Sequence, residues 1–228
     1  MSATNDIESS DVKQFDLIVW DWDGTIADST GMITQALIKA ADETGLPALS
    51  EERARSIIGL GLRESIEVLF GDIPNFQAQA LMTHYNRNYY AGENNILLFS
   101  GIAETIAGIA RKGCKQAVAT GKGRRGLNTA LQLSGLAKYF SATKTVDECF
   151  SKPHPQMLDE LMDELVVMPE RTLMIGDSQY DMQMGKNAGV ITAAVSYGSQ
   201  TAAHLQQYSP DKMFHDVATL SAWLLESI

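Results

Sequence analysis

The segment Asp21-Trp22-Asp23-Gly24-Thr25 places two carboxylates two residues apart, directly after a short apolar run. In extended or turning chain, such a pair can converge on one cation, or one carboxylate can act as nucleophile while the other moves a proton. An acidic turn is the competing interpretation, because Asp-Gly is a common turn pair. The pentapeptide alone leaves both interpretations open.

Two later features also follow apolar runs. Thr120 and Gly121 offer a hydroxyl and a backbone N–H, two groups that suit phosphate oxygens. Lys152 directly precedes Pro153, and proline restricts the backbone, so the lysine can be held in one direction. A strand exit and a surface lysine are the plain alternatives for these features.

A second pair of carboxylates, Asp177 and Asp181, follows another apolar run. Because the two are four residues apart, both side chains face one point if a helix starts there. Acidic residues also favour helix N-termini without any catalytic role.

The apolar runs themselves predict the scaffold. Residues 16–20, 116–120, 172–175 and 190–196 are short and apolar and alternate with segments of helical period. This alternation predicts an α/β fold with a doubly wound, Rossmann-like parallel sheet. Ligands bind such sheets at the carboxyl ends of the strands, which is where the polar features lie.

Almost a hundred residues separate the first two runs, far more than one crossover needs. They contain segments with helical periodicity at residues 32–44, 51–58, 63–70 and 76–90, and none of these segments has the pattern of a strand. We therefore expect a core of residues 1–28 and 96–228 and an inserted helical cap domain of residues 29–95. For the cap aromatics, lining of the cleft and packing of the cap interior both stay open, with packing favoured; they are His84, Tyr85, Tyr89 and Tyr90.

Composition excludes several classes of protein. A formal net charge of −10 argues against a nucleic-acid partner. No apolar run approaches the ~20 residues needed to cross a bilayer. Cys114 and Cys149 do not resemble a secreted disulfide framework and favour free thiols in the cytoplasm. Residues 1–14 are expected to form a loose polar tail.

Taken together and in this order, the four polar features resemble the signature of the haloacid dehalogenase-like hydrolase superfamily. The resemblance covers nearly the whole chain. Within it, Thr120-Gly121-Lys122, residues 151–155 and Gly59-Leu60-Gly61-Leu62 are most similar to phosphoglycolate phosphatase-like proteins. The resemblance implies a phosphatase with Asp21 as nucleophile, Asp23 as general acid/base and Lys152 steadying negative charge.

The resemblance also implies a Mg²⁺ cofactor and a set of groups that bind phosphate. Asp21, the Asp23 carbonyl oxygen and Asp177 are the expected metal ligands, with Asp181 in support. Trp22, Thr120, Gly121, Lys122 and Lys152 are the expected phosphate-binding residues. Arg63 is expected to grip the second anion of a small substrate such as 2-phosphoglycolate, with exposure in solvent as the alternative.

Two other functions stay open at this point. A phosphoglucomutase-like phosphoryl transferase of the same superfamily is one, although such relatives usually place a lysine in the cap. An NAD(P)-dependent oxidoreductase is the other, because Gly121, Gly123 and Gly126 match a dinucleotide fingerprint with Asp147 about twenty residues on. That function would leave Asp21, Asp23, Lys152 and Asp177 unexplained. A monomer and a homodimer are both compatible with the sequence.

Overall fold

A six-stranded, all-parallel sheet forms the centre of the structure, a computed structural model that describes residues 14–92 and 97–228. The strand order is β5-β4-β1-β6-β7-β8. The strands are β1 (Leu17–Trp20), β4 (Lys115–Thr120), β5 (Ala142–Thr145), β6 (Thr172–Gly176), β7 (Ile191–Val195) and β8 (Lys212–Phe214). Because β1 pairs in parallel with β4 and β6, three carboxyl ends meet in the middle of one edge.

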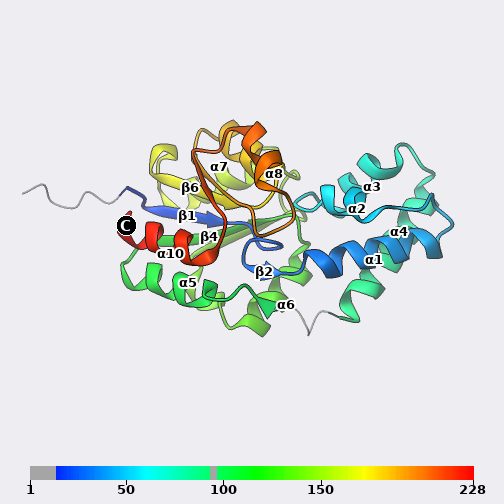
Figure 1. The fold of residues 1–228 in the computed structure, drawn as a ribbon, viewed down its shortest axis with the longest axis horizontal. Helices are drawn as coiled ribbons and strands as arrows, with labels where there is room; N and C mark the ends of the chain where they lie inside the picture. The colour runs from blue at the N-terminus through cyan, green and yellow to red at the C-terminus, as the bar shows by residue number, and fades with distance from the viewer. Residues whose placement is uncertain (1–13, 93–96) are drawn as a thin grey trace, which may run out of the picture.

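Helices cover both faces of this sheet (Figure 1). One face packs on α5 (Ile102–Arg111), α6 (Arg124–Ser134) and α10 (Val217–Glu226). The other packs on α7 (Gln156–Leu165) and α8 (Gln179–Asn187). The expected doubly wound α/β fold is therefore confirmed.

Alternate residues of the central strand divide between the two layers. Ile18 and Trp20 join the cluster of α5, α6 and α10, whereas Leu17 and Val19 join that of α7 and α8. A strand buried on both faces must be apolar at every position, which explains why β1 could be predicted. The remaining short elements are α9 (Ala202–Leu205) and the 3₁₀ helices Ala137–Tyr139, Pro169–Arg171 and Gln206–Tyr208.

The four predicted core strands are present, each within one residue of its expected ends. Within this sheet, two strands were not predicted, β5 and β8, and they form its two edges. Their sequences, ATKT and KMF, are short and mixed in polarity because edge strands are less completely buried.

Four helices of the described residues lie between β1 and α5, at one end of the molecule (Figure 1). They are α1 (Thr30–Glu43), α2 (Glu51–Ser56), α3 (Leu62–Phe70) and α4 (Asn75–Tyr90). Their apolar side chains form a cluster of their own, drawn wholly from residues 32–90. This separate cluster supports the division at residues 29 and 95, which we retain as a proposal.

A two-stranded antiparallel ribbon that was not predicted connects the helical segment to the sheet domain. It pairs β2 (Ala27–Asp28) with β3 (Leu97–Leu98). The ribbon brings the two ends of the insertion side by side, so the four helices leave and rejoin the core at one place.

Other predictions concern the chain as a whole. Cys114 and Cys149 are both buried and both free. Within the described residues, no helix has the length and apolar character that crossing a bilayer requires. The expected N-terminal tail lies outside the described residues, apart from Gln14.

Candidate active site

The sheet itself positions Asp21. Its backbone N–H continues the ladder by donating to the Ile175 carbonyl oxygen at 2.9 Å, so the carboxylate emerges at the carboxyl end of β1. Thr120 ends β4 on one side, and Asp177 follows β6 on the other. The fold thus gathers residues from three distant segments of sequence at one edge.

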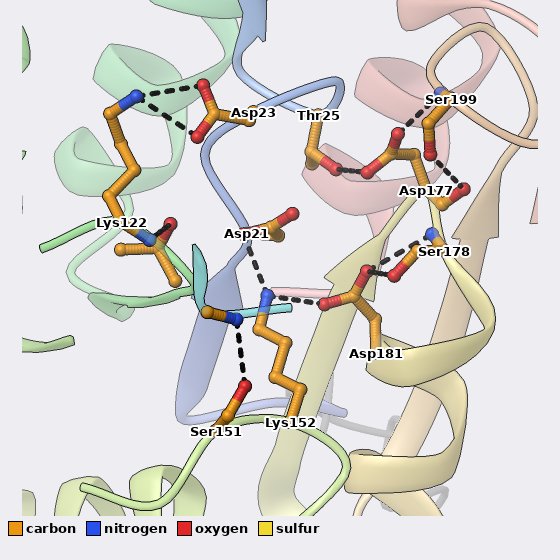
Figure 2. Close-up of polar contacts among 12 residues, drawn as sticks. Asp21, Asp23, Thr25, Lys122, Ser151, Lys152, Asp177, Ser178, Asp181 and Ser199 are labelled. Atoms are coloured by element: carbon orange, nitrogen blue, oxygen red, sulfur yellow. Dashed lines mark hydrogen bonds and ion pairs between the residues drawn. The ribbon is translucent and has the colours of Figure 1, made fainter. Parts of the chain in front are cut away.

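Lys152 is a buried cation between two carboxylates (Figure 2). Its Nζ lies 2.7 Å from Asp21 Oδ1 and 2.6 Å from Asp181 Oδ1. Burial by itself would lower the pKa of Lys152, but the Asp181 and Asp21 carboxylates outweigh it and raise that pKa, so the lysine is charged.

The two carboxylates that follow β6 have different surroundings. Asp181 Oδ2 accepts hydrogen bonds from the backbone N–H and the hydroxyl of Ser178 in a capping box at the start of α8. Lys152 donates to the other oxygen, Oδ1, so both oxygens of the Asp181 carboxylate already accept hydrogen bonds. Asp177 instead accepts from Thr25 Oγ1 at 3.2 Å and from the Ser199 N–H at 2.5 Å.

Asp23 lies on the side of Asp21 that faces the cap helices (Figure 2). Its Oδ1 accepts from Ser29 Oγ at 2.6 Å, and Lys122 Nζ lies 3.0 and 3.1 Å from its two oxygens. Lys122 also donates to the hydroxyl of Tyr89 on α4 at 2.6 Å. Sequence reasoning did not single out Ser29, and it did not anticipate the contact between Tyr89 and Lys122, because the two residues lie far apart in the sequence.

The buried carboxylates hold more negative charge than the lysine neutralises. Burial, followed by repulsion from Asp181 and Asp177, raises the pKa of Asp21 well above its usual range although Lys152 opposes this. Burial and Asp181 likewise raise the pKa of Asp177 to about 7. An additional cation would therefore stabilise the ionised forms of both groups.

The residues present fit a hard divalent cation. Asp21, Asp177 and Asp181 each offer a carboxylate oxygen, and these atoms lie within 4.8 Å of one another. Both Asp21 oxygens are buried; Oδ1 contacts Lys152, and Oδ2 has no hydrogen-bond partner among the described residues. Oxygen donors in this arrangement suit Mg²⁺. Because Asp181 is already engaged, Asp21 and Asp177 are the better direct ligands.

A loop of the cap packs directly on the core beside this site. A Cβ on Gly121 would lie 2.5 Å from the Leu60 carbonyl oxygen, so only glycine permits the approach. The Gly61 N–H donates to Ser151 Oγ at 2.9 Å. The loop of residues 59–61 thus lies against two of the segments that the sequence had singled out.

Between cap and core lies a cavity of about 110 Å³. The core side is lined by Asp21, Asp23, Thr120, Gly121, Lys122, Gly123 and Gly126. The cap side is lined by Ile33, Leu37, Ile57, Ile58, Gly59, Leu60, Leu62, Ser65, Tyr85, Asn86, Tyr89 and Tyr90. The cavity brings the candidate nucleophile and the candidate acid/base to a single small space.

The reaction class that these site residues suggest agrees with the protein family that the chain matches. The family model of the haloacid dehalogenase-like hydrolases matches residues 18–195. The chain belongs to this family. The expected family is thereby confirmed on independent grounds.

Individual relatives of this hydrolase cover most of its length. The pyrophosphatase PpaX of Bacillus cereus (strain B4264) is 29% identical over 205 residues, which are 89% of this chain and 93% of the relative. The structure of a haloacid dehalogenase-like hydrolase from Bacteroides fragilis matches with a TM-score of 0.83 at 25% identity, covering 90% of this chain and 99% of the other. A predicted phosphoglycolate phosphatase from Haemophilus somnus matches with a TM-score of 0.81 at 24% identity, covering 93% and 99%, which shows a shared fold.

Two expected phosphate-binding or substrate-binding residues of this hydrolase lie elsewhere. Arg63 does not line the cavity: its side chain is 78% exposed and pairs with Glu67 at 3.9 Å, on the outer face of α3. The Trp22 side chain is 2% exposed and packs in the core against Phe140, so only its backbone could meet a ligand. Arg63 therefore does not line the cavity in this structure, and its contact with a second anion stays a prediction.

The cap aromatics take up both of the roles that the sequence left open. Tyr85, Tyr89 and Tyr90 line the cavity besides packing among the cap helices. His84 alone among the four aromatics points away from it, with its Nδ1 2.9 Å from a Glu43 carboxylate oxygen.

The dinucleotide fingerprint has a structural explanation in this hydrolase. The Arg124 N–H at the start of α6 donates to Asp147 Oδ2 at 2.6 Å, so the chain's own carboxylate occupies the place where the fingerprint would bind phosphate. Gly121 is needed for contact with the cap loop instead. No observation in the described residues favours an oxidoreductase.

Substitution of Gly24 by alanine is expected to reduce activity by roughly 10²-fold, because misplaced catalytic groups lose rate steeply. Gly24 has a φ of +81°, and its added Cβ would lie 2.1 Å from Asp177 Oδ2, so Asp177 must move. Gly45 has a φ of +66° but open space around it, which makes Gly45→Ala a matched control for backbone strain of roughly 1–2 kcal/mol. Urea unfolding and phosphate release would be measured on both; equal activity of the two variants would contradict the prediction.

Proposed function

We propose that this chain is a Mg²⁺-dependent phosphatase that hydrolyses small phosphate monoesters through an aspartyl-phosphate on Asp21. The observation that carries the proposal is the Asp21 carboxylate itself. It is buried beside Lys152, keeps Oδ2 without a hydrogen-bond partner among the described residues, and borders the cavity together with Asp23. Membership of a hydrolase family whose relatives include named phosphatases supports the same reaction class.

In the first half-reaction, an Asp21 oxygen attacks phosphorus as the bond from phosphorus to the leaving oxygen breaks. Asp23 is the acid that delivers a proton to that oxygen. Its position across from Asp21, fixed by Ser29 and Lys122, suits a group that acts on the leaving side. Lys152 stabilises the charge around Asp21, and Thr120 offers its hydroxyl to a phosphate oxygen.

In the second half-reaction, water attacks the phosphorus of the aspartyl-phosphate while Asp23 takes its proton. The bond between phosphorus and the Asp21 oxygen breaks, and inorganic phosphate leaves with the nucleophile restored. Bound at Asp21 and Asp177, with the Asp23 carbonyl oxygen as the third expected ligand, Mg²⁺ would neutralise charge that otherwise repels a phosphate anion.

The cap residues that line the cavity limit how specifically the substrate can be assigned. The expected preference for 2-phosphoglycolate rested on the family resemblance and on Arg63, and Arg63 lies outside the cavity. Phosphoglucomutase-like relatives usually carry a cap lysine, whereas the cap residues that line the cavity include none. We therefore retain a phosphatase of small monoesters, acting on a small-molecule partner in the cytoplasm.

Mg²⁺ is expected to restore hydrolysis of p-nitrophenyl phosphate to EDTA-treated protein, whereas Ca²⁺, with its looser coordination, is not. Mg²⁺ should also raise the melting temperature more at about pH 8 than at about pH 5. The folded-state pKa of Asp177 is raised to about 7 from 3.8. Protonation of Asp177 therefore stabilises the metal-free folded state at low pH, and this stabilisation is lost as the pH rises through about 7. The cation then stabilises carboxylates that have become ionised.

Calorimetry at both pH values and a phosphate-release assay would test this. A metal-independent rate of similar size, together with no Mg²⁺-dependent shift in melting temperature, would contradict the metal site. As a control for general salt effects, Asp177→Asn should show a smaller shift at the higher pH.

A further inference from the structure

The cap side of the cavity is built from neutral groups. Its apolar members come from α1, the 57–60 loop and the start of α3, and they are Ile33, Leu37, Ile57, Ile58, Leu60 and Leu62. Its polar members are all uncharged hydroxyl and amide groups, and they are Ser65, Tyr85, Asn86, Tyr89 and Tyr90. Such groups can hydrogen-bond alcohols and pack on carbon chains, but they cannot balance a charge.

Among the described residues that line the cavity, Lys122 alone is cationic. Its ammonium is committed to Asp23, whose two oxygens lie 3.0 and 3.1 Å away, and to the hydroxyl of Tyr89. The Lys122 side chain is only 7% exposed, so this pair is shielded from solvent. Drawing Lys122 to a second anion of the substrate would leave the Asp23 carboxylate without its cation.

Other nearby cations are engaged outside the cavity. Arg125 stacks on the Tyr90 ring with its guanidinium carbon 4.9 Å from the ring centre, and it does not line the cavity. Arg55, within hydrogen-bonding distance of the Gly198 carbonyl oxygen at 3.5 Å, does not line it either. Residues 93–96, which the structure does not describe, contain neither lysine nor arginine.

The charge balance of the whole site also disfavours a second anion on the substrate. Four carboxylates meet here, on Asp21, Asp23, Asp177 and Asp181, and the two lysines with one divalent cation offset them. The substrate's phosphate then adds further negative charge to the site. A second anion on the leaving group would lie against the neutral cap wall without a cationic partner among the described lining residues, which is unfavourable.

We propose that this phosphatase selects phosphate monoesters whose leaving group is a small, uncharged, hydroxylated alcohol, and that it discriminates against leaving groups that carry an anion. The inference rests on the proposed function and adds the chemical class of the substrate. The volume of about 110 Å³ limits the size of the leaving group, and the neutral cap wall determines its charge. Selection by an unpaired charge can exceed what a difference of one methylene achieves.

Glycerol 3-phosphate and 3-phosphoglycerate form a matched pair of probes, because they differ only in a terminal CH₂OH or carboxylate. We expect kcat/KM for glycerol 3-phosphate to exceed that for 3-phosphoglycerate on the order of tenfold or more. The anionic probes 2-phosphoglycolate and pyrophosphate should rank with 3-phosphoglycerate. Equal or lower kcat/KM for glycerol 3-phosphate would overturn the inference.

Charge placed on the cap wall should reverse the selection. Asn86 lines the cavity from α4 and is exposed, so Asn86→Arg is expected to raise relative kcat/KM for 3-phosphoglycerate by about tenfold. Thr83→Arg adds the same charge one turn earlier on the same helix, away from the lining residues, and should leave the ratio unchanged. Arg63→Ala should also leave it unchanged; a selective loss on 3-phosphoglycerate would overturn the inference.

Phosphatase activity and the preference for an uncharged leaving group can be tested separately. If the protein hydrolyses p-nitrophenyl phosphate but prefers acidic esters among the natural probes, the inference about the leaving group is overturned. The phosphatase assignment then still stands. No Mg²⁺-dependent release from any of these esters would overturn the proposed function and, with it, the inference.

Discussion

Replacement of Asp21 by asparagine is expected to abolish phosphate release, with a loss on the order of 10⁵-fold or more in kcat. An amide oxygen cannot displace the leaving group to form an acyl-phosphate, and no other described carboxylate lies beside both Lys152 and the cavity. The fold should survive, because asparagine has nearly the same shape as aspartate.

The unfolding free energy of Asp21→Asn should match or exceed that of the wild-type protein. Burial and neighbouring carboxylates raise the pKa of Asp21, so its charge opposes folding, and the substitution removes that charge. Asp28→Asn, at an exposed position shortly after the motif, is the matched control and should keep full activity. Wild-type turnover in Asp21→Asn, measured with p-nitrophenyl phosphate, would show that the nucleophile is another group.

Replacement of Lys152 by methionine is expected to have the largest effect on stability, a loss of about 3–5 kcal/mol, besides removing activity. Lys152 is fully buried and is the shared ion-pair partner of Asp21 and Asp181. Methionine can fill much of the same space, but it leaves two buried carboxylates facing each other. Urea unfolding of the metal-free protein would measure the loss.

Lys144→Met provides the comparison for this second prediction. Lys144 also touches two carboxylates, Glu160 and Glu164, at 2.9 and 3.4 Å, but on the solvated side of the molecule. Such surface pairs contribute about 1 kcal/mol or less. Equal losses in the two variants would contradict the view that Lys152 neutralises a buried acidic cluster.

The sheet and the core of the site could be predicted because both depend on patterns that are local in sequence. β1 and β6 are continuous apolar runs, as strands buried on both faces must be. Parallel strands place their carboxyl ends along one edge, so residues such as Asp21 and Asp177 could be assigned to a common site. The edge strands β5 and β8 escaped prediction because their partial exposure removes the apolar signal.

The cap contribution could not be predicted in the same way. Periodicity identifies Tyr89 as buried, but burial against cap neighbours and burial against Lys122 look alike in sequence. For Arg63, the sequence carries a signal that favours the exposed alternative. Ile66 and Leu69 mark the buried face of α3, and Arg63 shares the opposite face with Glu67.

The most direct test of the central claim uses Asp23→Asn with p-nitrophenyl phosphate and Mg²⁺. The good leaving group needs little help from an acid, so Asp21 should still be phosphorylated, but hydrolysis of the intermediate lacks its base. Rapid mixing should show a burst of about one p-nitrophenolate per protein molecule, followed by a slow phase. Acid-quenched protein should carry one phosphoryl group on the peptide that contains Asp21. Steady turnover without a burst, or a phosphoryl group on any other residue, would contradict an aspartyl-phosphate at Asp21.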